Sequence, residues 1–227
     1  QVKNKTSVIY ESVADEFLVK PSKENLENTK KKFNLNCDFL LYTGVWRDHK
    51  NVVGLIKAFG NLLNPPCQED FKAPLTRGVG GLQLVITGRE DPFYPEVKET
   101  VKALKLENDV VFTGLVPEEE LLSLYHLCKA YVFPSFYEGF GLPVLEAFAC
   151  DKPLICSDKS SLLEIAGKDN AVFFNPYDIN DIVEKMSIVL NDELLQEKLI
   201  ENGQKRLKDF SWRKMADLIF DIYKNTQ

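Results

Sequence analysis

The sequence predicts an α/β protein built on one doubly wound parallel sheet of about six strands. From residue 39 onward, short apolar runs alternate with helical patterns. Each run is apolar on both faces, which is typical of a parallel strand covered by helices on two sides. Hydrophobic residues make up 44% of the 227-residue chain, so one or two domains with a full core are expected.

The predicted strands are runs of aliphatic, β-branched and aromatic residues. They span 39–42, 82–87, 110–112, 130–133, 154–156 and 171–174. Sheets of this kind bind ligands beyond the carboxyl ends of their strands. The loops that follow these runs are therefore where we expect the chemistry.

Helical patterns lie between and after the strands. Pro117 followed by three glutamates predicts a helix start, because proline suits the first turn and acidic side chains suit the helix dipole. We expect that helix to bury Leu121, Leu124, Tyr125 and Cys128. Apolar residues also repeat at helical spacing over 179–190 and 212–223.

Two segments fall outside the alternation. Residues 1–38 hold a short apolar stretch followed by a charged one, and residues 64–81 contain three prolines and three glycines. The second segment exceeds the roughly 2–6 residues usual for a connection in an α/β unit. We interpret it as a surface insertion, with a lid or partner loop as the alternative.

Composition disfavours several classes of protein. The 28 basic and 34 acidic residues give a net charge of −6, whereas nucleic-acid binders usually carry a basic surplus. The longest uncharged runs fall well short of the roughly 20 residues that span a bilayer, so no transmembrane segment is predicted. Five scattered cysteines without a CxxC pair indicate neither a disulfide framework nor a zinc site.

The turn after the strand 130–133 carries the strongest functional signal. Gly139 and Gly141 allow a ligand to approach the backbone closely, and Pro143 fits the first turn of a helix. The amides near Gly141 and Leu142 would then lie at a helix N-terminus, where phosphate oxygens bind well. The turn therefore predicts a site for a phosphorylated ligand.

Two carboxylates accompany this turn. Glu138 precedes the expected helix and Glu146 lies about one turn inside it, so both can face the same crevice. A carboxylate repels a phosphate but accepts hydrogen bonds from hydroxyl groups. Sugar and ribose hydroxyls are the partners that these two residues suit.

The motif Glu138-x7-Glu146, set within Pro-Ser-x-x-Glu-Gly-Phe-Gly-Leu-Pro-x-Leu-Glu-Ala, resembles the donor-site motif of the retaining GT-B glycosyltransferases of family 4, the glycosyltransferase group 1 proteins. The likeness runs from about residue 8 to residue 223. Other stretches look like family segments in the same order: the first strand and phosphate loop, the second strand, the base-binding turn and two later loops, at 42–51, 85–88, 111–117, 157–165 and 174–178.

The resemblance implies a division of the chain. Residues 39–210 would form one Rossmann-like nucleotide-sugar-binding domain, the C-terminal half of a GT-B fold. Residues 1–38 would be the inter-domain segment with its lead-in helix, and residues 211–227 the C-terminal crossover helix, with an apolar face left partly uncovered. Because the sequence begins with Gln1, we interpret it as a processed protein or part of a longer one that carries an N-terminal GT-B domain.

Family roles carry over to the matching positions. Glu138 would be the catalytic residue that binds sugar hydroxyls near the reacting carbon, and Glu146 would hold the ribose. Lys50 would neutralise the leaving diphosphate beside the loop glycine Gly44, and the backbone around Val116 would meet the base. Backbone amides would contact the diphosphate or sugar at Phe140, Gly141 and Leu142, next to Gly139.

Two positions depart from the usual family pattern. The family often has an arginine directly after the loop glycine, where this chain has Val45, and we expect Arg47 to take over that phosphate contact. Asp151 stands where many members have glycine, which we interpret as a turn substitution. The chain contains no Asp-x-Asp, so neither a cofactor nor an obligatory metal is expected.

The expected function is transfer of a hexose from a nucleoside diphosphate sugar to a glycan or lipid-linked acceptor. The His-Lys-Asn end of the phosphate loop and the Ser-Ser-Leu run after Asp158 resemble mannosyl transferases, so GDP-mannose is the first candidate donor. UDP-glucose, UDP-N-acetylglucosamine and dTDP-sugars stay open.

Other readings remain beside this one. They are a non-catalytic nucleotide-sugar-binding module and a GT-B nucleotide-sugar epimerase or phosphorylase relative. The expected location is the cytoplasm, with peripheral contact at the inner face of the membrane as an alternative. We expect slow or no transfer without the N-terminal domain.

Overall fold

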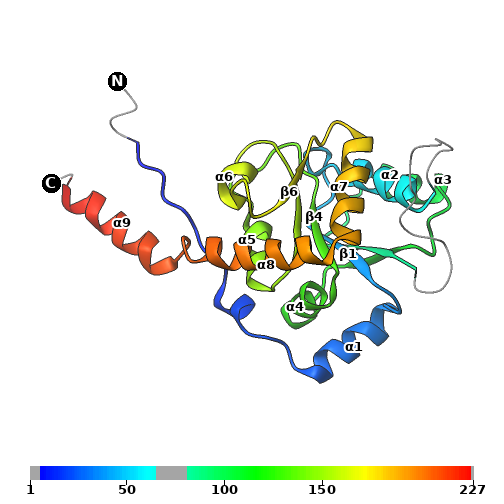
Figure 1. Ribbon diagram of the computed structural model, residues 1–227, viewed down its shortest axis with the longest axis horizontal. Coiled ribbons are helices and arrows are strands. Elements are labelled where there is room, and N and C mark those ends of the chain that lie inside the picture. Colours follow the sequence, from blue (N-terminus) through cyan, green and yellow to red (C-terminus); the bar gives the residue numbers. More distant parts are fainter. Residues whose placement is uncertain (1–5, 65–80, 226–227) are drawn as a thin grey trace.

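The structure, a computed structural model, describes residues 6–64 and 81–225 and has the predicted α/β architecture (Figure 1). A six-stranded sheet has the order β3-β2-β1-β4-β5-β6, and every neighbouring pair is parallel. Its strands are β1 (Phe39–Thr43), β2 (Gln83–Thr87), β3 (Val110–Gly114), β4 (Ala130–Phe133), β5 (Leu154–Ser157) and β6 (Val172–Phe174). All six predicted strands are confirmed.

Apolar runs on both faces build two separate cores. In β1, Leu40 and Tyr42 point into one core, and Phe39 and Leu41 point into the other. This alternation follows from the two-residue period of a strand. The sheet is therefore buried between two layers of helices.

The helical layers divide by face. One core is covered by α2 (Val52–Leu63), α3 (Glu96–Ala103) and α7 (Ile179–Asn191). The other is covered by α1 (Lys23–Phe33), α4 (Glu118–Leu127), α5 (Leu142–Ala149) and the short α6 (Leu162–Ala166). The long α8 (Glu193–Leu207) contacts α5 and α7. Two 3₁₀ turns, η2 (Asp15–Leu18) and η3 (Asp48–Lys50), also lie in the part of the chain that the structure describes.

Three details correct the sequence predictions. Pro117 is the N-cap of α4 instead of a residue of its first turn. The buried face of α4 includes Leu122, whereas Leu121 is only partly buried, because the helix is rotated relative to the expected pattern. The helix α8 was not predicted at all. Of the expected insertion, residues 65–80 lie outside the described ranges.

The last helix, α9 (Trp212–Asn225), projects away from the sheet (Figure 1). Its apolar side chains Phe220 and Tyr223 are 59% and 71% exposed. At its start, the Trp212 indole donates a 2.9 Å hydrogen bond to the Val13 carbonyl, which joins the two ends of the domain. The expected uncovered apolar face is therefore present, while the domain boundaries stay a prediction.

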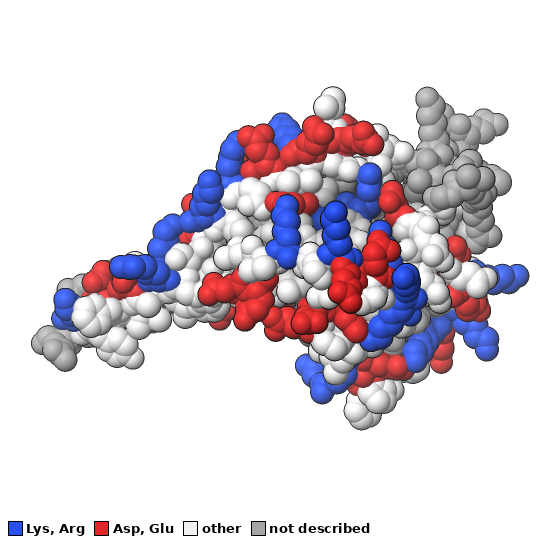
Figure 2. All heavy atoms as spheres, turned by 90° about the horizontal axis from the view of Figure 1, so that it is seen from below, with Lys and Arg blue, Asp and Glu red and all other residues white. Residues whose placement is uncertain are grey.

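Neither the distribution of surface charge nor the cysteines indicate a functional site. On the face shown in Figure 2, basic and acidic side chains are interspersed. Cys37, Cys128, Cys150 and Cys156 are free thiols, and burial raises the pKa of Cys128 to about 12. Cys67 lies outside the described residues. Among residues 6–64 and 81–225, no helix is long and apolar enough to cross a membrane.

Candidate functional site

The candidate site lies where the strand order reverses. The connections from β1 run to β2 on one side, and β4 pairs on the other, so the loops after β1 and β4 diverge above the sheet. In open α/β sheets this divergence forms the crevice in which ligands bind. It places the loop of residues 44–51 opposite the loop of residues 134–141.

Two glycines lie at the base of the crevice, where the loops after β1 and β2 come close together. Gly44 and Gly88, directly after β1 and β2, have φ values of 150° and 128°. A Cβ atom at Gly88 would lie 2.1 Å from the Gly44 carbonyl oxygen. The loops after β1 and β2 can therefore lie this close only because Gly88 lacks a side chain.

An ion pair joins the two loops across the crevice. The Lys50 Nζ atom lies 2.7 Å and 2.9 Å from the two carboxylate oxygens of Glu138. The side chains are only 21% and 11% exposed. Ser135 donates a further 2.6 Å hydrogen bond to Glu138 Oε1. A predicted cation and a predicted catalytic carboxylate, 88 residues apart, are thus in direct contact.

The loop that carries Glu138 is held from below by the loop after β5. The Glu138 amide donates to Ser160 Oγ at 2.9 Å. The Ser161 hydroxyl lies 3.1 Å from the Glu138 carbonyl oxygen and 2.9 Å from the Phe140 carbonyl oxygen. These bonds fix the backbone on both sides of Gly139 and set the position of the carboxylate.

The helix α5 starts at the mouth of the crevice. Its N-cap Gly141 has a φ of 105°, and no side chain caps the helix. A Cβ at Gly141 would meet Leu162 at 2.7 Å, so glycine is required by both space and backbone angle. Proline follows early in the helix, as predicted. The helix N-terminus is consequently open to an anion.

Glu146 lies one turn inside α5 and belongs to a buried polar network. Its Oε2 atom accepts a 2.6 Å hydrogen bond from the Tyr125 hydroxyl. Thr43, the last residue of β1, lies 3.1 Å from the Tyr125 hydroxyl and 2.8 Å from that of Tyr131. Burial raises the pKa of Glu146, and the bond from Tyr125 opposes that rise. The network links the carboxylate to the end of the central strand.

Other predicted site residues lie around this centre with different partners. Arg47 is exposed on the outer side of η3, with its Nε 4.0 Å from Asp91. Val116 is partly buried and packs on the core beneath α4. Phe140 packs against Tyr10 and Phe210, at ring distances of 6.2 and 6.1 Å. The Arg47 carbonyl accepts a 2.9 Å hydrogen bond from the Lys50 amide, while its guanidinium pairs with Asp91 instead of Glu138.

Sequence reasoning missed one residue that organises the site. The buried Asn51 amide donates to the Pro134 carbonyl at 3.1 Å and to the Pro176 carbonyl at 2.9 Å. It thereby ties the loops after β1, β4 and β6 together. The available signal was an asparagine at the end of η3, a residue type that tolerates the left-handed conformation found here.

The arrangement can bind an anion and hydroxyl groups at the same place. Lys50 and the open helix N-terminus supply positive potential, while Glu138 and Glu146 supply hydrogen-bond acceptors. Within the part of the chain that the structure describes, no group of three or more His, Cys, Asp and Glu side chains could hold a metal ion. The crevice suits a diphosphate joined to hydroxylated rings.

Comparisons with known proteins show what the chain is similar to. The family described as "Glycosyl transferases group 1" matches residues 23–206. Serotype-specific mannosyltransferase WbdA of Escherichia coli is 33% identical over 94% of this chain and 25% of its own length. O-antigen chain mannosyltransferase B of Escherichia coli is 32% identical over 82% of this chain and 45% of its own length.

A solved structure shows the same fold. Anabaena HepE in complex with UDP-glucose superposes with a TM-score of 0.80 at 19% identity, over 97% of this chain and 57% of that one. The chain thus spans about half or less of the length of these proteins. The predicted resemblance is confirmed, and because the family match covers well over half of its residues, the chain belongs to the glycosyl transferases of group 1.

Proposed function

We propose that this chain is the donor-binding half of a retaining glycosyltransferase. It would move a hexose, with GDP-mannose as the first candidate donor, to a glycan or lipid-linked acceptor. The observation that carries the proposal is the Lys50–Glu138 ion pair, 2.7 Å long, at the switch point beside the uncapped start of α5. It sets a cation and an acceptor of hydroxyl hydrogen bonds side by side.

The proposed mechanism divides the substrate between these groups. The diphosphate lies against Lys50 and the amides of Phe140, Gly141 and Leu142. The bond between the anomeric carbon and the phosphate oxygen breaks, and its electron pair stays on the departing nucleoside diphosphate. Fixed positive groups stabilise the charge that develops there. Glu138 meanwhile holds hydroxyls of the sugar, whose ring carries positive character.

The nucleoside would extend along α5. Glu146, bonded to Tyr125 at 2.6 Å, would present its other carboxylate oxygen to the ribose hydroxyls. The base would meet the backbone around Val116, after β3. Both assignments keep carboxylates away from phosphates, which they would repel.

The donor proposal is supported by named relatives. Two relatives at 33% and 32% identity are mannosyltransferases, which favours mannose as the transferred sugar. The chain spans 25% and 45% of their lengths, so we place the main part of the acceptor site in a second domain outside this chain. Transfer would then need that domain. The proposed location is the cytoplasm, at the membrane for a lipid-linked acceptor.

Calorimetry with a panel of donors tests the proposal. The panel is GDP-mannose, UDP-glucose, UDP-N-acetylglucosamine and dTDP-glucose, each with its nucleoside diphosphate and each repeated in EDTA. We expect one donor to bind clearly and EDTA to leave its affinity unchanged. If none of these nucleotides binds, the proposed function is wrong.

Two variants separate the roles of the ion pair. Glu138→Gln should not weaken binding of the nucleoside diphosphate but should weaken binding of the donor sugar by about tenfold or more, because one charged hydrogen bond is worth about 1.5–3 kcal/mol. Lys50→Met should weaken both ligands. The matched controls are Glu119→Gln and Lys102→Met on exposed helix surfaces, which should bind like the unmodified chain. Equal effects of Glu138→Gln on both ligands would contradict the assignment.

A further inference from the structure

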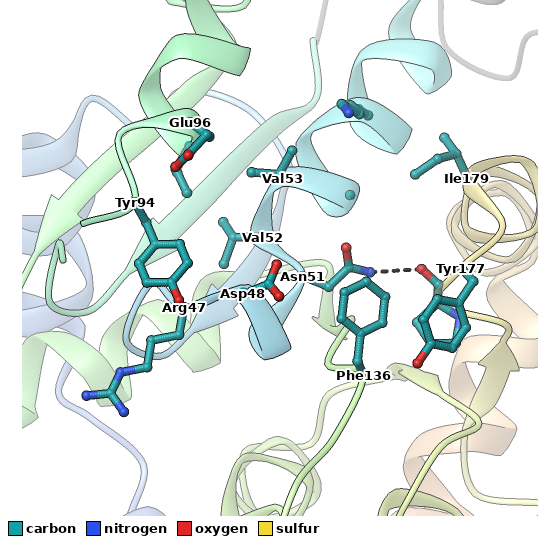
Figure 3. Close-up of a pocket in the computed structure, with 14 residues that line it drawn as sticks. Arg47, Asp48, Asn51, Val52, Val53, Tyr94, Glu96, Phe136, Tyr177 and Ile179 are labelled. Carbon is teal, nitrogen blue, oxygen red and sulfur yellow. Dashed lines mark hydrogen bonds between the residues drawn. The ribbon is translucent and has the colours of Figure 1, made fainter. Parts of the chain in front are cut away.

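A cavity lies beside η3 and is lined by Arg47 and Asp48, but not by Lys50 or Glu138 (Figure 3). Its volume is about 450 Å³, within the roughly 300–1,000 Å³ typical of ligand pockets. The first turn of α2 lines it between the start of α3 and the start of α7. None of the proposed steps uses this cavity.

One wall of the cavity is aromatic. The Phe136 and Tyr177 rings stack in parallel, with centroids 4.7 Å apart and planes 10° apart. Tyr177 is 69% exposed although it is a large aromatic residue. Tyr94 lies across the cavity, and Val52 and Val53 lie between the two walls (Figure 3). The cavity thus offers flat apolar surfaces on two sides.

Charged groups of both signs surround these surfaces. Arg47, Asp48, Lys57 and Glu96 line the cavity, and all four are exposed. Two cations and two carboxylates give no net charge, so a second diphosphate is poorly matched. Carboxylates and a guanidinium beside aromatic rings match a sugar, whose C–H faces pack on rings while its hydroxyls donate and accept hydrogen bonds.

The cavity and the donor crevice share a wall. The Phe136 amide donates a 2.8 Å hydrogen bond to the His49 carbonyl. This bond joins the loops of residues 44–51 and 134–141, which separate the cavity from the crevice. Phe136 lines the cavity two residues before Glu138, and Asp48 lines it two residues before Lys50. A saccharide whose end reacts in the crevice can therefore extend into the cavity.

The cavity also lies away from the ends of the domain. Tyr10 and Phe210, where the chain comes in and leaves, pack on Phe140 in the core beneath α5. The cavity lies on the opposite helical layer, with α2 and α3, far from the termini in Figure 1. The segments at the two ends of the domain therefore do not cross the side of the crevice on which the cavity lies.

We propose that this cavity is a saccharide-binding site that holds sugar units of the acceptor chain beyond the unit that reacts. The proposal rests on the proposed function, because a saccharide acceptor is its premise. It assigns part of acceptor recognition to this domain. Tyr177 is the stacking platform, and Glu96 on the opposite wall accepts hydrogen bonds from sugar hydroxyls.

Binding of free oligosaccharides to the 227-residue chain tests it. Titrations followed by NMR would use tetrasaccharides of α-linked mannose, α-linked glucose, β-linked glucose and β-linked N-acetylglucosamine, without nucleotide. We expect the α-mannoside to bind most tightly. Tyr177→Ala should weaken it by about three- to tenfold, the contribution typical of an aromatic contact. Glu96→Ala should also weaken it.

The matched control is Tyr137→Ala. Tyr137 is 66% exposed, close to the value for Tyr177, and lies next to Phe136 in the loop after β4 without lining the cavity. It should bind the oligosaccharide like the unmodified chain. Equal loss in Tyr137→Ala and Tyr177→Ala would overturn the proposal, as would the absence of oligosaccharide binding at millimolar concentration.

Parallel nucleotide titrations separate the two proposals. All three variants should bind the preferred nucleoside diphosphate unchanged. If nucleotides bind and no oligosaccharide does, the saccharide site is wrong and the donor function stands. If oligosaccharide binding depends on Tyr177 and no nucleotide binds, the donor function is wrong and the saccharide site stands.

Discussion

Glu146 is the residue at which the structure makes the sharpest prediction. Replacing it with alanine removes the acceptor of a 2.6 Å hydrogen bond from the fully buried Tyr125 hydroxyl. Thr43 Oγ1, 3.1 Å away, remains as a weaker partner. A lost hydrogen bond to a charged group costs about 1.5–3 kcal/mol. We expect Glu146→Ala to lower the free energy of unfolding by that amount.

Glu146→Gln should behave differently, because the amide oxygen still accepts the bond from Tyr125. Burial raises the pKa of Glu146 in the folded chain, so the folded state holds more protons than the unfolded state between the two pKa values. The contribution of Glu146 to stability therefore falls as pH rises from about 4.3, the ordinary value for glutamate. The loss ends above the raised folded pKa.

Glutamine has no proton to exchange in this window. The stability of the unmodified chain, minus that of Glu146→Gln, should therefore fall as pH rises through it. Urea unfolding at half-unit pH steps measures this difference directly. Parallel profiles for the two proteins, or an equal loss of stability in the glutamine and alanine variants, would refute the reasoning.

Both Glu146 variants should also weaken ligand binding. Under the proposed function, Glu146 holds ribose hydroxyls that are present in both the donor and the free nucleoside diphosphate. Loss of the charge should weaken both ligands by about tenfold. Calorimetry with the two ligands checks this. A variant that weakens only the donor would place Glu146 at the sugar instead of the ribose.

Three further predictions follow from the backbone and from α9. Gly88→Ala should destabilise the chain by about 3 kcal/mol or more in urea unfolding, since its Cβ would lie 2.1 Å from the Gly44 oxygen at a φ of 128°. Gly139→Ala should keep full stability, because no atom lies within 4 Å of the added Cβ, yet weaken donor binding in calorimetry by crowding the ligand. Phe220→Ser should change stability by less than about 0.5 kcal/mol, because the ring is 59% exposed; a larger loss would mean that α9 packs on the domain.

Much of the fold could be predicted because the sheet leaves a strong pattern. The four inner strands are buried on both faces and the two edge strands partly so, and their mostly apolar runs stand out between polar loops. The helix α8 leaves a weak pattern, since only Gln196, Leu199 and Gly203 are buried in it. This helix packs on other helices instead of the sheet, so its apolar residues do not follow a regular helical spacing that would predict it.

The sequence predicted which loops form the site, but not which side chains contact each other there. Glu138 and Lys50 could be placed after strands, because parallel strands deliver their following loops to one edge. Their 2.7 Å contact depends on the side-chain geometry of two loops 88 residues apart in sequence. Tyr177 belongs to a stretch that resembles a family loop, but its stacking on Phe136 could not be predicted, because the two residues follow different strands.

The ion pair also constrains how the substrate can lie. Under the proposed function, Lys50 serves the leaving diphosphate and Glu138 serves the sugar, on opposite sides of the bond that breaks. These two groups are 2.7 Å apart, with little exposure to solvent. The bond must therefore lie directly above the pair, within reach of both. Because the charges of the pair already neutralise each other, the arriving diphosphate must draw Lys50 partly from Glu138, which frees carboxylate lone pairs for the sugar hydroxyls. Binding of the diphosphate and recognition of the sugar would thereby be coupled through one contact.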